Sequence, residues 1–72
     1  MNVNELKIEM LRHGDNGADL AKALGIVRQT LSTKMNGSNG SEFTQGEIAK
    51  IKDRYNLSPE RIAEIFFAQK MS

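Results

Sequence analysis

Residues 17–37, "GADLAKALGIVRQTLSTKMNG", decide the fold of this chain. Leu20 and Leu24 are separated by one helical turn, and Gly25 follows them, which is typical of a helix that ends there. A second apolar series begins at Val27 and repeats every four residues until the next Asn-Gly pair. The segment therefore predicts two short helices joined by a tight turn that contains glycine.

The second of these predicted helices carries polar side chains suited to reading DNA. When its apolar series faces the core, Arg28, Gln29, Ser32 and Thr33 face outward. Arg can donate two hydrogen bonds to guanine, Gln can pair with adenine, and hydroxyl groups can meet either base edge. A solvated helix face is the alternative, but such a face more often carries Glu and Lys, and residues 20–41 contain no acid. The pattern favours base readout.

Helices are also predicted on both sides of this pair. Residues 3–13 place apolar side chains on one stripe, and Asn2 or Asn4 can cap the start. Asn2 with Glu5 three residues on resembles a capping box, and Asn16 is expected to cap the helix that contains Leu20. Thr44 and Glu47 form a capping box, and Ser58 followed by proline starts a last helix. Strand patterns are poor. We therefore expect an all-α chain, a compact five-helix bundle with a helix-turn-helix, built as one domain over residues 1–72.

Composition excludes several classes of site. The chain has 72 residues, no cysteine and one histidine, so disulfides and a zinc site are not expected. No motif places a base beside a nucleophile or forms a phosphate loop, so we expect neither an enzyme nor a cofactor or small-molecule substrate. No apolar run reaches the length of a membrane span and no signal peptide opens the chain, which predicts no membrane contact and a cytoplasmic location.

The same segment carries a family resemblance. "DLAKALGIVRQTLSTKMNG" resembles the helix-turn-helix of the Cro/CI-type phage repressor family, also called the XRE family. The family pattern is Leu-Ala, then Leu-Gly-hydrophobic, then Asn-Gly at the end of the recognition helix. The later segment "SEFTQGEIAKIKDRYNLSPERIAEIFF" is similar to the equivalent region of small regulators from phages and prophages of Gram-positive bacteria. The resemblance covers nearly the whole chain and implies a lambda-repressor-like DNA-binding domain.

The resemblance also implies a function and a set of contacts. It implies a sequence-specific regulator of transcription in a bacterial host cell, a repressor that binds double-stranded operator DNA through residues 27–36 in the major groove. Base contacts are expected from Val27, Arg28, Gln29, Ser32 and Thr33. Phosphate contacts are expected from Gly17, Lys22, Thr30, Lys34, Asn36 and Ser38.

Three positions depart from the family pattern. Gly17 stands where members often have Gln or Thr, so that only its backbone N–H is available to a phosphate. Val27 replaces a Ser or Thr cap, which removes a bond commonly worth about 1 kcal/mol. Lys34 occupies a position that is often apolar, and we expect Met35 to take the buried role while Lys34 extends toward the backbone.

Two questions stay open at the level of sequence. Phe66 and Phe67 are neighbours on the last helix, so one can reach the core while the other covers a loop or makes a contact in a homodimer, formed either before DNA binding or on the DNA. The near-neutral net charge of +1, Gly17 and the phenylalanine expected to be exposed leave an alternative function, a protein-interaction module of antirepressor or antitoxin type on the same scaffold.

Overall fold

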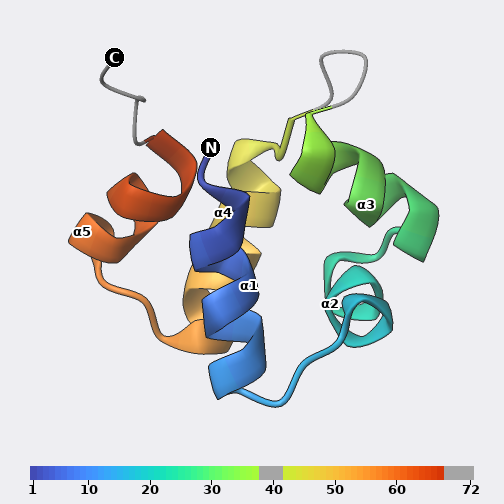
Figure 1. Cartoon of the computed structure of the whole chain (residues 1–72), viewed down its shortest axis with the longest axis horizontal. Helices are drawn as coiled ribbons and strands as arrows, with labels where there is room; N and C mark the ends of the chain where they lie inside the picture. The colour runs from blue at the N-terminus through green and yellow to red at the C-terminus, as the bar shows by residue number, and fades with distance from the viewer. Residues whose placement is uncertain (38–41, 68–72) are drawn as a thin grey trace.

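In the computed structural model, every regular element of the described residues, 1–37 and 42–67, is a helix (Figure 1). The elements are α1 (Val3–Arg12), α2 (Gly17–Leu24), α3 (Arg28–Asn36), α4 (Gln45–Tyr55) and α5 (Pro59–Ile62), which continues as a π-helical turn, η2 (Ala63–Phe67). Figure 1 shows α2 and α3 together on one side of the molecule and α5 on the opposite side. The predicted all-α class is confirmed.

The helix starts follow the caps that the sequence predicts. In α2, Asn16 Oδ1 accepts from the Asp19 N–H at 2.8 Å, and the Asp19 carboxylate accepts from the Asn16 N–H at 3.0 Å. Thr44 and Glu47 make the same reciprocal pair at the start of α4. Ser58 caps α5, with proline at its first position. These side chains satisfy backbone N–H groups that a helix leaves without partners.

Two glycines end the helices of the central pair. Gly25 has φ +73° and Gly37 has φ +67°, the left-handed region that side chains with a Cβ avoid. At the first of these ends, the Gly25 N–H donates to Lys22 O at 3.1 Å and the Ile26 N–H donates to Ala21 O at 3.0 Å. The turn between α2 and α3 is therefore closed by backbone bonds that only glycine accommodates without strain.

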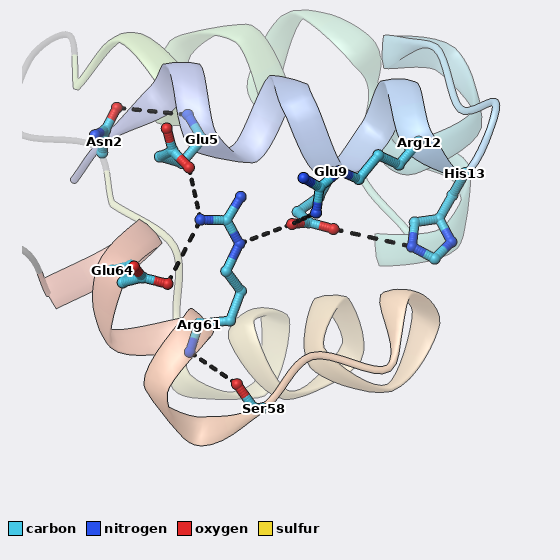
Figure 2. A network of polar contacts seen from close by, with 8 residues as sticks. All are labelled: Asn2, Glu5, Glu9, Arg12, His13, Ser58, Arg61 and Glu64. Carbon is cyan, nitrogen blue, oxygen red and sulfur yellow. Dashed lines mark hydrogen bonds and ion pairs between the residues drawn. The ribbon is translucent and has the colours of Figure 1, made fainter.

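The start of α1 differs from the expected capping box. Asn2 Oδ1 accepts from the Glu5 N–H at 3.4 Å, but the Asn2 N–H donates to Ile65 O at 2.7 Å. The Glu5 carboxylate accepts instead from Arg61 Nη1 at 2.6 Å (Figure 2). Half of the predicted box is replaced by contacts that fasten α1 to the C-terminal helix.

The core collects one deeply buried side chain from each helical segment. These side chains are Leu6, Leu20, Leu31, Ile51 and Ile65. The radius of gyration is 11.4 Å, close to the value of about 11 Å expected for a compact chain of this length. Val27, the first residue of the apolar series in the sequence, is 68% exposed because it precedes the first turn of α3 and does not share its buried face.

The C-terminal segment departs from the single regular helix that its apolar spacing predicts. Residues 63–67 form a π turn, whose hydrogen bonds span one residue more than those of an α-helix. Phe66 is half-buried and meets the ring of Phe43 edge-on, with 5.6 Å between centroids, whereas Phe67 is 63% exposed. The structure thus assigns the inward role to Phe66.

Candidate nucleic-acid interface

A three-residue turn, Gly25 to Val27, holds α3 against α2. Leu31 is 1% exposed and anchors α3 from beneath, while Ala21, 3% exposed, lies on the buried face of α2. Val27 gives α3 no side-chain cap, although its carbonyl accepts from the Leu31 N–H at 3.1 Å. Leu31 is the one buried residue of α3, and four others, Arg28, Gln29, Ser32 and Asn36, are exposed.

The side chains predicted to contact bases lie on this surface. Arg28, Gln29 and Ser32 are exposed, as is Val27 before them. Thr33 is half-buried, and its hydroxyl donates to Gln29 O at 2.9 Å, so the Thr33 oxygen keeps only acceptor capacity. α3 contains no acidic residue. We call these five positions the strip: none of them is acidic, and Arg28, Gln29 and Ser32 offer exposed hydrogen-bond donors.

Arg28 has a defined neighbour on α2. A Cβ added at Gly17 would lie 3.2 Å from Arg28 Nε and 3.8 Å from Arg28 Cγ, so the arginine side chain crosses the start of α2 where glycine leaves room for it. This places a guanidinium beside the positive end of the α2 dipole, an arrangement that an anion would stabilise. The structure therefore brings together Gly17, which is expected to contact a phosphate, and Arg28, which is expected to contact a base.

An open groove of about 330 Å³ lies beside this pair, between α1 and α3. Its polar lining comes from Lys7, Arg28, Ser32 and Asn36. Its apolar lining comes from Met10, Leu31 and Met35. Lys7 is a candidate that the sequence did not indicate. The apolar stripe of α1 shows which face of that helix is buried, but it does not show which helix lies next to Lys7.

The two lysines expected at phosphates have different surroundings. Lys22 is exposed in the last turn of α2. Lys34 is only 16% exposed and donates to Glu47 Oε1 at 2.8 Å and to Glu42 O at 3.2 Å. Burial alone would raise the pKa of Glu47, but the bonds from Lys34 and Thr44 outweigh it and hold that pKa below its usual value. The Lys34 ammonium is thus already neutralised within the chain.

Two of the other phosphate candidates belong to α3. Asn36 is exposed in the last turn of α3, and Thr30 is half-buried. Ser38 lies outside the described residues. The nearest acid along the chain on the α2 side is Asp19, whose carboxylate accepts from the Asn16 N–H and so is occupied in its capping box.

Asp15 fixes the loop that leads into α2. Arg54 donates to its two oxygens at 2.6 and 2.8 Å, and the Tyr55 hydroxyl donates at 2.6 Å. The Arg54 hydrogen bonds lower the pKa of Asp15, against an opposing effect of burial and with help from Tyr55. His13 stacks on Tyr55 with 4.9 Å between ring centroids. The α1–α2 loop is therefore held to the end of α4, which sets where α2 begins.

The described residues contain no group of three or more His, Asp or Glu side chains placed to hold a metal ion. Within residues 1–37 and 42–67, no helix has the length and apolar character needed to cross a bilayer. In comparisons with known proteins, no family model, no curated protein and no solved structure matches this chain.

Proposed function

We propose that this chain is a sequence-specific double-stranded DNA-binding regulator of transcription, a repressor of the Cro/CI type, which inserts α3 into the major groove. The observation that carries the proposal is the acid-free strip of α3, which Leu31 and the Gly25 turn hold in place and on which Arg28, Gln29 and Ser32 are exposed. These side chains match the donor and acceptor patterns that distinguish base pairs in the major groove.

The packing of α3 supports insertion into a groove. One face is buried through Leu31, whereas Val27 at its start is 68% exposed and can meet a thymine methyl. Nine residues of helix extend about 13 Å, which fits within the major groove and covers roughly four base pairs. Lys22 and Asn36 are exposed and can donate to phosphates, while half-buried Gly17 can offer its backbone N–H.

The test begins with selection of bound duplexes from a random-sequence library by the purified chain. Affinity for the selected duplex is then measured for the wild type and for Arg28→Ala, Gln29→Ala and Lys52→Ala. Each arginine or glutamine variant should lose about 1–3 kcal/mol of discrimination at one position of the site. Lys52, exposed on α4, provides a matched loss of one charge and should bind as the wild type does.

A protein-interaction module is the second candidate, and exposed apolar side chains favour it. Leu11 is 81% exposed on α1, and Phe67 is 63% exposed beside a hollow of about 280 Å³ that Met1, Phe43 and Phe66 also line. For this candidate, selection should enrich no duplex, and Arg28→Ala should behave as the wild type in every nucleic-acid assay. Enrichment of one sequence that Arg28→Ala no longer prefers would rule it out as the main activity.

A further inference from the structure

The groove between α1 and α3 has the chemistry of a surface for an anionic chain. Four of the eight residues that line it are Lys7, Arg28, Ser32 and Asn36, and no acidic residue lines it. Lys7 is exposed, and it takes part in no ion pair among residues 1–37 and 42–67. The groove therefore offers the Lys7 ammonium, the Arg28 guanidinium, a hydroxyl and an amide. No acidic side chain in its lining neutralises the two cations.

The rest of the groove is apolar. Met10 and Leu31 are buried, Met35 is half-buried, and all three line the groove together with Gly17. A DNA strand alternates an anionic phosphate with a largely apolar deoxyribose. A groove of about 330 Å³ that is lined by both hydrogen-bond donors and side-chain carbons matches such a strand better than it matches a free inorganic anion, which has no apolar part.

We propose that this groove holds the phosphodiester backbone of one DNA strand, with Lys7 of α1 and Asn36 of α3 donating to its phosphates from opposite sides. The inference rests on the proposed function and extends the contact surface from α2 and α3 onto α1. Lys7 is then a positioning residue that adds affinity for every sequence and selects none, because phosphates are the same at every step. Its contact with the phosphate also fixes how deeply α3 enters the major groove of the DNA.

The experiment compares wild type, Lys7→Ala, Lys7→Arg and Lys52→Ala on the selected duplex and on a scrambled duplex over a range of salt concentrations. Lys7→Ala should lower affinity about fivefold at 150 mM salt for both duplexes, and the salt slope should fall by about 0.9. Lys7→Arg should keep the wild-type slope because the charge is retained. Lys52→Ala, which removes the same charge from α4, should keep both the slope and the affinity.

Three results would overturn the inference, and they can be told apart. If Lys7→Ala keeps the wild-type slope while Arg28→Ala loses discrimination, α1 makes no backbone contact although the proposed function stands. If Lys7→Ala changes which sequence is preferred, Lys7 contacts a base and not a phosphate. If the wild type binds neither duplex and Lys7→Ala reduces binding to an acidic peptide instead, both proposals fail together. Circular dichroism of each variant verifies that α1 remains folded.

Discussion

Gly17 and Arg28 form the pair on which the site depends at the scale of single residues. Glycine is a poor choice for the first turn of a helix, because it loses the most backbone freedom on folding. The structure gives a reason for it, since a Cβ at this position would lie 3.2 Å from Arg28 Nε. We infer that Gly17 is present to let the Arg28 side chain lie across the start of α2.

Replacing Gly17 with alanine should weaken DNA binding while it stabilises the folded chain. Gly17→Ala should raise the free energy of unfolding by about 0.4 kcal/mol, because alanine restricts the unfolded chain. It should also displace Arg28 and weaken binding to the selected duplex. Gly46→Ala is the matched control, since Gly46 is also in the first turn of a helix and its added Cβ would meet only Thr44 Oγ1 at 3.9 Å.

Denaturant titrations and DNA-binding isotherms on both variants provide the measurement. The control should gain similar stability and keep wild-type affinity. Equal affinity for Gly17→Ala and Gly46→Ala would show that the position of Arg28 against α2 does not matter for binding.

Asp15 should make stability depend on pH. The Arg54 hydrogen bonds are the main cause of its lowered pKa, which means that folding favours the ionised carboxylate. The stabilisation is therefore fully present above the unfolded pKa, near 4, and is lost as the pH falls through the lower folded value. Asp15→Asn should cost about 1–2 kcal/mol at pH 7, since Arg54 is partly exposed to solvent.

The measurement is the free energy of unfolding by urea at neutral pH and well below pH 4. The difference between Asp15→Asn and the wild type should shrink in acid. Asp53→Asn, at an exposed position on α4, should change stability little at either pH. A difference for Asp15→Asn of the same size at both pH values would contradict the assigned ion pair.

At the scale of elements, one arginine joins helix α5 to helix α1 (Figure 2). Arg61 of α5 donates to Glu5 Oε1 at 2.6 Å and to Glu9 Oε2 at 2.7 Å, one turn apart on α1. The Glu9 side chain is 5% exposed and the Arg61 side chain 19%. A carboxylate this deeply buried needs a cation, and α1 and α5 must stay together to supply it.

Arg12 offers a matched comparison, because its Nη1 atom donates to the same Glu9 oxygen at 3.2 Å. Arg61→Met should cost about 2–3 kcal/mol, somewhat less than a buried pair with no second cation. Arg12→Ala, at a side chain that is 66% exposed, should cost less than about 0.5 kcal/mol. The free energies of unfolding of the two variants test this, and equal values would show that burial does not set the strength of these pairs.

The elements show which parts of the fold the sequence predicts. Caps such as Asn16 and Thr44, and helix ends such as Gly25, follow from residues within three or four positions of each other. The π turn over 63–67 has no such local pattern. The contact between Arg61 and Glu5 joins positions 56 apart, and no periodicity within one helix indicates which partner a side chain will meet.

The candidate site also has parts that follow from local sequence and parts that do not. The outward strip of α3 was predictable because Leu31 and the helical period fix which residues face away from the core. The placing of Lys7 beside α3 and of Arg28 over Gly17 depends on how helices pack. Lys34 shows the same limit, since its ion pair with Glu47 arises from the approach of α3 to the start of α4.

At the scale of the whole molecule, the proposed attraction for DNA cannot come from net charge, which is only +1. In the proposed function it comes from two local cations, Arg28 and Lys7, which line one groove beside a helix α3 that contains no acidic residue. A domain with few phosphate contacts binds weakly and loses affinity steeply as salt rises. We therefore expect two copies to act together on one operator.

Binding by two copies of the chain predicts how the half-sites of the DNA are arranged. One α3 of nine residues covers roughly four base pairs, so a pair of chains should select an inverted repeat whose half-sites are about 10 base pairs apart. Sequencing of the duplexes recovered by selection, together with the mass of the complex by sedimentation, tests this. Recovery of an unrepeated site bound by a single chain would contradict it.

The central claim is that the exposed strip of α3 reads bases, and one measurement tests it most directly. Arg28→Ala and Lys52→Ala are compared with the wild type for binding to every single-base variant of the selected duplex at about 150 mM salt. We predict that Arg28→Ala loses preference at one guanine while Lys52→Ala retains the full wild-type profile. If Arg28→Ala retains that profile and affinity, α3 does not read DNA and the account is wrong.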